Sequence, residues 1–153
     1  MALLVVRSPL LGTTTPMSEV PDPVFADGLL GPGVLIDPPR TGEAAALAPI
    51  DGTIAAIHHH AFVVTAPDGR AVLVHLGLDT VELHGTGFTM HAVAGQQVRA
   101  GDVVLHWRPG DVAAGGRSPL SPVVAIAAEP GTVSLRAAVG STVAAGDELF
   151  AWR

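Results

Sequence analysis

The chain has 153 residues and a mass of 15.5 kDa, and 48% of its residues are apolar, which is enough for one domain with a single core. Its net charge of −6 argues against nucleic acid and anionic lipid as partners, because both bind through cationic side chains. The absence of cysteine excludes disulfide frameworks and thiol chemistry. All eight basic residues are arginine, so biotin or lipoate attachment, Schiff-base chemistry and a phosphate-loop lysine are excluded as well.

Short apolar runs separated by turn sequences follow one another along the chain. The 18 Gly and 13 Pro leave little room for long helices. The runs have the length and the β-branched content of strands. We expect strands at Ala2–Val6, Val34–Ile36, Phe62–Thr65, Ala71–Leu76, Val103–Trp107, Val123–Ala127, Val133–Leu135 and Glu148–Trp152. This pattern predicts an all-β, antiparallel sandwich or barrel with at most short helical turns, folded as a single domain over residues 1–153.

The segment Thr53–Phe62 is ambiguous. Its apolar residues Ile54, Ile57 and Ala61 fit a helical stripe as well as a strand, so periodicity alone does not decide between them. Glycine and proline on its flanks favour a strand. The turn sequence Pro67–Gly69 then predicts a hairpin between the strands on either side of it.

Two short patterns each occur twice. Gly-x-x-Val-x-x-Gly-Asp spans residues 95–102 and again 140–147, and Pro-x-x-Gly-Thr spans residues 9–13 and 49–53. The glycines of the longer pattern permit positive φ and its aspartate can cap a tight turn before the next strand. We interpret the repeats as a partially duplicated β motif, with chance repetition in a glycine-rich β protein as the alternative.

Histidines are the main candidates for chemistry. Residues 58–60 are all histidine, and His75 lies in the apolar run 72–76. A strand that is apolar on both faces is expected to be central, so His75 needs a hydrogen-bond partner or a place where the sheet opens into a site. A satisfied core histidine is the simpler interpretation. The Gly77 and Asp79 that follow, and the histidine cluster one hairpin away, favour a functional site.

A longer motif surrounds His75. Residues 74–88 read Val-His-Leu-Gly-Leu-Asp-Thr-Val-Glu-Leu-His-Gly-Thr-Gly-Phe. This string resembles the signature around the phosphorylated histidine of the glucose-type enzyme IIA (EIIA) domains of the phosphoenolpyruvate-dependent sugar phosphotransferase system. Further blocks match in the same order along nearly the whole chain: Val20–Asp27, Gly31–Val34, Ala48–Thr53, His60–Phe62 and Ser118–Val124. The better-known members carry a threonine where this sequence has His58, which makes His58 the candidate replacement donor.

The resemblance implies a phosphocarrier rather than a hydrolase. It makes His75 the phosphoryl acceptor through Nε2, with its Nδ1–H held by a nearby backbone carbonyl such as that of Gly77. Neutral imidazole suits this role because one nitrogen attacks while the other keeps its proton. His60 would stabilise the phosphoryl group and its transfer, with a purely structural neighbour as the alternative.

The same resemblance implies the partners and the setting. These are the histidine-containing phosphocarrier protein HPr and a IIB domain of a sugar permease, in the cytoplasm. No cofactor is required, but His60 and His75 could hold an adventitious zinc ion together with a carboxylate of a partner. The implied partner-binding rim consists of Asp22, Val24, Phe25, Phe62, Asp79 and Val81. Core packing is the alternative for the four apolar residues, most strongly for Phe62. A solvated face or turn capping is the alternative for Asp22 and Asp79.

Two other classes of function stay open at this point. His58-x-His60 and His75-x-Gly77-x-Asp79 spell the two ligand motifs of zinc endopeptidases of the lysostaphin type. They stand in the reverse order here, and the opening residues do not fit a secretion signal. The other alternative is a purely regulatory binding module, in which phosphorylation of His75 only switches the protein that is bound. A phosphocarrier could also have regulatory targets of this kind.

Overall fold

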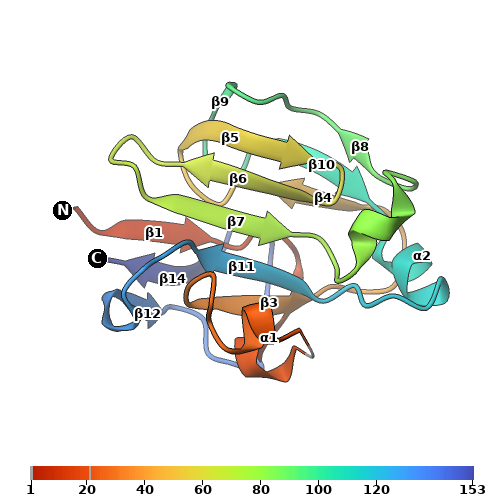
Figure 1. The fold of residues 1–153 in the computed structure, drawn as a ribbon, viewed down its shortest axis with the longest axis horizontal. Coiled ribbons are helices and arrows are strands. Elements are labelled where there is room, and N and C mark those ends of the chain that lie inside the picture. The colour runs from red at the N-terminus through yellow and green to blue at the C-terminus, as the bar shows by residue number, and fades with distance from the viewer. Residues whose placement is uncertain (1, 21) are drawn as a thin grey trace.

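One large antiparallel sheet organises the computed structural model, which describes residues 2–20 and 22–153 (Figure 1). Its eight strands are hydrogen-bonded in the order β13-β2-β3-β11-β7-β6-β5-β9. They are β2 (Gly12–Pro16), β3 (Gly33–Asp37), β5 (Gly52–His58), β6 (Ala61–Thr65), β7 (Ala71–His75), β9 (Gln97–Val98), β11 (Ser121–Ala125) and β13 (Thr142–Val143). The strand that carries His75 is therefore central, between β11 and β6, as predicted.

Two three-stranded sheets complete the sandwich. Their strand orders are β1-β14-β12 and β4-β10-β8, and all of their pairings are antiparallel. The strands are β1 (Leu4–Arg7), β4 (Ala44–Leu47), β8 (Thr89–Met90), β10 (Val103–Trp107), β12 (Val133–Leu135) and β14 (Glu148–Trp152). The predicted all-β fold is confirmed, because the remaining elements are the short helices α1 (Pro23–Ala26) and α2 (Pro109–Ala114) and the 3-10 turns η1 (Met17–Glu19), η2 (Thr80–Leu83) and η3 (Pro130–Thr132).

The main core lies between the large sheet and the two small ones. Phe62 and Val74 from the large sheet pack in one cluster with Trp107 of β10 and Phe150 of β14, and all four side chains are buried. Since the chain has few aromatic residues, most of the cluster is aliphatic. Burying each such large side chain contributes about 1.5–3 kcal/mol, so this cluster is the chief source of stability.

A second, smaller cluster covers part of the opposite face of the large sheet. There η1 and α1 pack Val20 and Phe25 against Leu35 of β3, Val124 of β11 and Leu78. Because this face is also covered, successive residues of the central strands are apolar on both sides. This explains the unbroken apolar run before His75.

The internal repeats correspond to a structural duplication. Each Pro-x-x-Gly-Thr segment begins a strand that pairs with one Gly-x-x-Val-x-x-Gly-Asp segment, β2 with β13 and β5 with β9. In both copies the closing aspartate accepts a bond from the amide three residues earlier, at 2.8 Å from Arg99 to Asp102 and at 2.9 Å from Ala144 to Asp147. The predicted duplicated motif is confirmed.

The two copies also hydrogen-bond to each other reciprocally. The amide of Arg7 donates to the carbonyl of Pro49, and the amide of Leu47 donates to the carbonyl of Pro9, both at 2.9 Å. Equivalent groups thus exchange bonds across a local pseudo-two-fold. Chance repetition does not produce such reciprocity.

The hairpin and the ambiguous segment behave as predicted. Gly69 has φ of 94° and closes the turn between β6 and β7 through a bond of its amide to the Ala66 carbonyl at 2.9 Å. Thr53–Phe62 forms β5 and the start of β6, and the pairing shifts register between Ile54 and Ala56. This bulge interrupts strict alternation and explains the resemblance to a helical stripe.

Five strands are absent from the predicted set: β8, β9 and β13 have only two residues each, and the two longer ones, β2 and β4, lack the usual strand signals. The β4 strand, Ala44–Leu47, is mostly alanine and lacks the β-branched residues that mark strands. The β2 strand, Gly12–Pro16, is bounded by the glycine and proline that otherwise indicate turns. Within the described residues, no helix has the length and apolar composition needed to span a membrane.

Candidate functional site

His75 is the last residue of β7 and lies on the face covered by α1. Its neighbour Val74 belongs to the main core, and Leu73 packs against the second cluster on the opposite face. Alternation along the strand therefore places the His75 ring beside α1. The ring of Phe25 lies 5.5 Å away at 62°, and the ring of His60 lies 5.2 Å away at 70°. His75 is thus partly buried between an aromatic wall and a second imidazole.

A backbone hydrogen bond fixes the protonation pattern of His75. Its Nδ1 lies 2.5 Å from the carbonyl oxygen of Gly77. Since a carbonyl only accepts, Nδ1 must carry the proton, and in the neutral ring the lone pair is on Nε2. Gly77 reaches this position with φ of 78°, in the left-handed region that favours glycine.

His60 lies in the tight turn between β5 and β6, across the ladder from His75. Its carbonyl accepts the amide of Leu76 at 2.7 Å, so its backbone is fixed to the residue that follows His75. His58, the candidate replacement donor, stacks its ring on that of His60, at 5.9 Å between centroids and 28° between planes. The β5–β6 hairpin therefore brings part of the histidine cluster to His75.

Burial keeps both imidazoles neutral. Desolvation lowers the pKa of His75, and this effect outweighs the Gly77 hydrogen bond and the nearby Asp22 and Asp79, which act in the opposite direction. Desolvation also lowers the pKa of His60, with smaller contributions from His75 and the neighbouring histidines. At neutral pH the site therefore presents an uncharged nucleophile beside a second uncharged imidazole.

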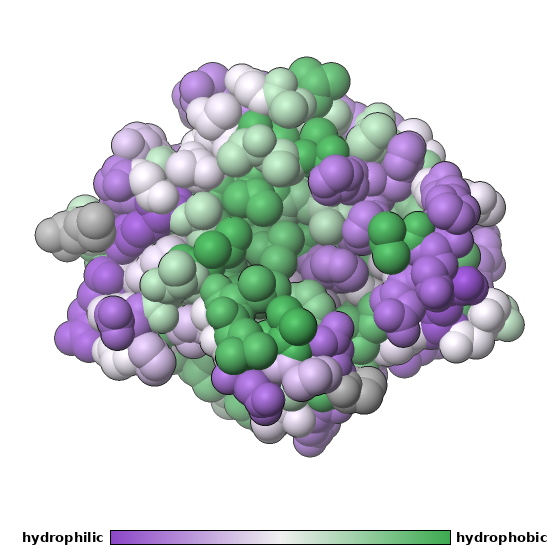
Figure 2. All heavy atoms as spheres, viewed as in Figure 1, coloured by the Kyte–Doolittle hydropathy of each residue, from purple (hydrophilic) through white to green (hydrophobic). Residues whose placement is uncertain are grey.

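Four of the six predicted rim residues lie on α1, on η2 or at the N-caps of these two elements. Val24 is 40% exposed and Val81 is 58% exposed, one on α1 and one on η2. Asp22 and Asp79 are close enough to influence His75 electrostatically. Figure 2 shows apolar surface running across this face of the large sheet towards α1, with polar surface on both sides. A mixed surface of this kind suits protein docking.

The structure also shows the alternative role of Asp22, turn capping. Its Oδ1 accepts the amide of Val24 at 3.0 Å, and the residue is the N-cap of α1. Capping and a docking charge are compatible, because an N-cap carboxylate uses one oxygen for the helix and leaves the other exposed to a partner. Asp79 starts η2 with φ of 59°, without a side-chain cap.

The placement of two aromatic rim residues requires correction. Phe62 is only 1% exposed and belongs to the main core, because β6 directs it, with its cross-strand partner Val74, towards the small sheets. Core packing is therefore the correct interpretation. Phe25, expected in an exposed patch, is only 8% exposed and packs against the sheet and the His75 ring. It forms a wall of the site rather than a protruding anchor.

Two buried hydroxyls next to the site were not identified from the sequence. Ser121 is 0% exposed and its Oγ accepts the amide of Gly77 at 3.2 Å. Thr80 is 1% exposed and donates to the carbonyl of Leu76 at 2.7 Å. The available signal was a polar residue inside an otherwise apolar run, as in Ser121-Pro-Val-Val. That signal is weak without knowledge of what lies beside it.

The arrangement does not fit a zinc endopeptidase. Within residues 2–20 and 22–153, no group of three or more His, Cys, Asp or Glu side chains is placed to hold a metal ion. His58 stacks on His60 instead of converging with it on a common point, so the two ligand motifs do not meet. A catalytic zinc site needs three protein ligands around one open position.

Comparisons with known proteins agree with this geometry. The model of the family described as phosphoenolpyruvate-dependent sugar phosphotransferase system, EIIA 1, matches residues 4–130. Among solved structures, the glucose permease IIA from Mycoplasma capricolum is similar over 99% of this chain and 96% of its own, with 31% sequence identity and a TM-score of 0.86. The resemblance found around His75 thus extends to the whole fold.

Proposed function

Because the chain belongs to the EIIA 1 family of the phosphoenolpyruvate-dependent sugar phosphotransferase system, as a glucose-type EIIA domain, we propose that it carries a phosphoryl group from HPr to a IIB domain of a sugar permease on Nε2 of His75. The observation that carries this proposal is the bond between His75 Nδ1 and the Gly77 carbonyl, which leaves the lone pair on Nε2. We further propose that the reaction takes place in the cytoplasm.

Phosphoryl acceptance is a displacement at phosphorus. The Nε2 lone pair of His75 attacks the phosphoryl group of phosphorylated HPr, a new N–P bond forms, and the electron pair of the old N–P bond returns to the histidine of HPr. Transfer to the IIB domain repeats the exchange with His75 as the leaving group. The protein contributes mainly positioning and electrostatics, because the transition state is loose and needs little covalent help.

His60 supports the step by its place beside His75. At 5.2 Å between ring centroids, an N–H of His60 can reach a phosphoryl oxygen carried on Nε2. The low pKa of the free ring, set mainly by burial, opposes a permanent positive charge, and an arriving dianion draws a proton towards the pair. His60 therefore stabilises the phosphorylated state without a charge that would resist onward transfer.

Recognition of HPr combines apolar contact with charge. Val24 on α1 and Val81 on η2 supply exposed apolar area, and Asp22 and Asp79 supply negative charge for an arginine of HPr. Near a phosphoryl dianion these carboxylates are unfavourable until the partner's cation arrives. This balance keeps the transfer reversible.

No metal takes part in the proposed transfer. His60 and His75 supply two imidazole nitrogens, and tetrahedral zinc prefers four ligands, so a zinc ion here would need a carboxylate from a bound partner. We expect transfer from HPr to proceed at an unchanged rate in the presence of a chelator.

The decisive experiment is phosphorylation followed by intact mass. The protein is incubated with phosphoenolpyruvate, enzyme I and HPr, and one acid-labile phosphoryl increment is expected. Addition of a IIB domain should then remove that increment. No increment on wild-type protein would refute the proposed function. Retention of the phosphoryl group with every IIB domain tested would instead favour a purely regulatory module.

A further inference from the structure

Both peptide groups that flank Gly77 have all of their polar atoms bonded. In the first, the carbonyl of Leu76 accepts from the Thr80 hydroxyl at 2.7 Å, and the amide of Gly77 donates to Ser121 Oγ at 3.2 Å. In the second, the amide of Leu78 donates to the carbonyl of Ser118 at 2.8 Å. The remaining atom, the Gly77 carbonyl oxygen, accepts from His75. The carbonyl that sets the His75 tautomer thus belongs to a network in which every polar atom of both peptides is hydrogen-bonded.

The network leaves Gly77 little room for another conformation. A Cβ at this position would lie 2.6 Å from Thr80 Cγ2 and 2.9 Å from the carbonyl oxygen of Ser118. The turn is therefore packed closely on both sides and holds a positive φ. Since peptide dipoles in a chain of hydrogen bonds polarise one another, donation by the Leu78 amide also strengthens the Gly77 carbonyl as an acceptor.

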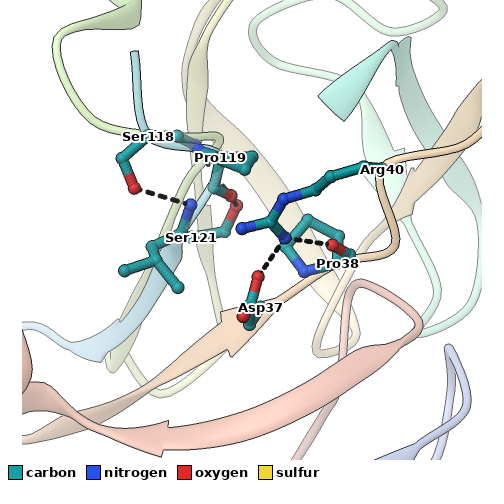
Figure 3. Close-up of polar contacts among 8 residues, drawn as sticks. Asp37, Pro38, Arg40, Ser118, Pro119 and Ser121 are labelled. Carbon is teal, nitrogen blue, oxygen red and sulfur yellow. Dashed lines mark hydrogen bonds and ion pairs between the residues drawn. The ribbon is translucent and has the colours of Figure 1, made fainter. Parts of the chain in front are cut away.

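The turn that follows α2 supports this network from the neighbouring strand. Ser121 is fully buried at the start of β11, and its hydroxyl donates to the carbonyl of Pro119 at 2.9 Å. With its proton committed there, Oγ faces the Gly77 amide as an acceptor. The Ser118 hydroxyl accepts the amide of Leu120 at 3.2 Å and tightens the same turn (Figure 3). In the same view the Arg40 side chain donates a hydrogen bond to Asp37, the last residue of the adjoining strand β3.

We propose that Ser121, assisted by Thr80, is a positioning residue that keeps Nε2 of His75 unprotonated through the Gly77 peptide. The proposal rests on the function proposed above, in which Nε2 is the acceptor. Loss of the Ser121 hydroxyl leaves the Gly77 amide buried without an acceptor, and the Leu76–Gly77 peptide must rotate or shift to find one. Because this peptide joins the Gly77–Leu78 peptide at the Cα of Gly77, its movement also displaces the Gly77 carbonyl from Nδ1, and the imidazole proton then redistributes towards Nε2.

The test measures the His75 tautomer by nitrogen NMR of the unphosphorylated protein. In wild type, we expect the shifts of a ring protonated on Nδ1. In Ser121→Ala, both shifts should move towards the average of two tautomers, and Ser121→Thr, which retains a hydroxyl, should restore the wild-type pattern. Thr80→Val keeps the shape of the side chain and removes the second bond, so it should give a smaller shift in the same direction.

A matched control separates positioning from general destabilisation. Ser8 is 1% exposed and its hydroxyl also donates to a backbone carbonyl in a turn, that of Leu10 at 2.7 Å. Ser8→Ala should lower the melting temperature without changing the His75 tautomer. The phosphorylation rate from HPr should fall about tenfold in Ser121→Ala, the effect of losing about 1.4 kcal/mol of transition-state stabilisation.

Each outcome has a defined meaning. An unchanged tautomer in folded Ser121→Ala, or an equal change in Ser8→Ala, would overturn the positioning role. If Ser121→Ala does not fold, an unchanged tautomer in folded Thr80→Val has the same consequence. The NMR measurement needs no partner protein, so a wild-type protein that shows the Nδ1–H tautomer but takes no phosphoryl group would refute the proposed function and leave the positioning result intact.

Discussion

Within residues 2–20 and 22–153, two pairs of histidines pack edge to face, and their difference indicates which features would suit an imidazole to accept a phosphoryl group. His60 and His75 lie 5.2 Å apart at 70°, and His91 and His106 lie 4.7 Å apart at 89°. In the second pair, Nε2 of His91 is hydrogen-bonded to Nδ1 of His106 at 2.6 Å, so each ring occupies a nitrogen of the other. In the first pair, a backbone carbonyl occupies Nδ1 of His75 and its Nε2 stays available.

The surroundings of the two pairs differ as well. His75 is enclosed by Phe25 and lies at the end of a central strand, whereas His106 belongs to a small three-stranded sheet and its partner His91 is exposed. Proximity of two imidazoles is therefore not sufficient. A fixed tautomer and partial burial distinguish the pair for which we propose phosphoryl transfer.

The largest effect on phosphorylation should come from replacing one histidine of each pair, His75 or His106, by alanine. His75→Ala should abolish phosphorylation by HPr, because the attacking lone pair is lost while the apolar neighbours of β7 remain. His106→Ala should be phosphorylated at the wild-type rate, since its ring lies outside the docking face. Intact mass measures both variants, and thermal melting confirms their folding. Full phosphorylation of His75→Ala would show that another residue is the acceptor.

Replacing the other histidine of each pair, His60 or His91, should affect the rate of phosphoryl transfer differently. His60→Gln keeps a donor but cannot take up a proton, so we expect phosphorylation of His75 to persist and onward transfer to a IIB domain to slow by about 10²-fold, as for loss of one acid–base group. His91→Gln should transfer normally. Quench-flow measurement of the two variants decides this point, and a wild-type rate in His60→Gln would leave His60 as a structural neighbour only.

A third effect should separate the docking face from other exposed apolar side chains. Val81 is 58% exposed on η2, two residues after Asp79, and Val139 is 49% exposed elsewhere on the molecule. Val81→Ser should weaken HPr binding about tenfold, in the range of about 1–2 kcal/mol for a contact near the centre of an interface. Val139→Ser should bind normally. NMR titration with HPr gives both affinities, and equal affinities would place the interface elsewhere.

Individual residues show which structural features could be predicted from the sequence and which could not. The strand character of residues 71–76, the hairpin turn before them and the duplicated motif depend on local sequence, and all three were predicted correctly. The side to which Phe62 points depends on the register of β6 against β7, and burial of Phe25 depends on where α1 lies. Ser121 meets Gly77 across 44 residues of chain, a contact that only the sheet order determines.

The pH dependence of stability should report the burial of His75 and His60. Burial lowers the pKa of His75 and of His60 below the ordinary value of 6.5, so the unfolded chain binds more protons than the folded domain in acid. Their contribution is complete above about pH 6.5 and is lost as the pH falls through the folded pKa values, with a slope of at most about 1.4 kcal/mol per pH unit for each group.

Urea unfolding at about pH 7.5 and about pH 5 measures this difference. His75→Gln should lose less stability than wild type between the two conditions, because the variant no longer has a buried imidazole to protonate. If His75→Gln retained the full pH dependence, the acid sensitivity would have to arise from other groups.

The smallest effect concerns the charge of Asp22, which the structure allows to be separated from its capping role. Asn caps helices about as well as Asp, so Asp22→Asn should preserve the bond to the Val24 amide and the melting temperature. The lost charge should slow association with HPr a few-fold at low salt and change little near 1 M, where the screening length is about 3 Å. The pKa of His75 should also fall, because Asp22 raises it.

Asp22→Ala loses both the charge and the cap, and its melting temperature should drop. Stopped-flow association across a salt series distinguishes the two roles, and a defect in Asp22→Asn that persists at high salt would identify the carboxylate as structural rather than as a docking charge.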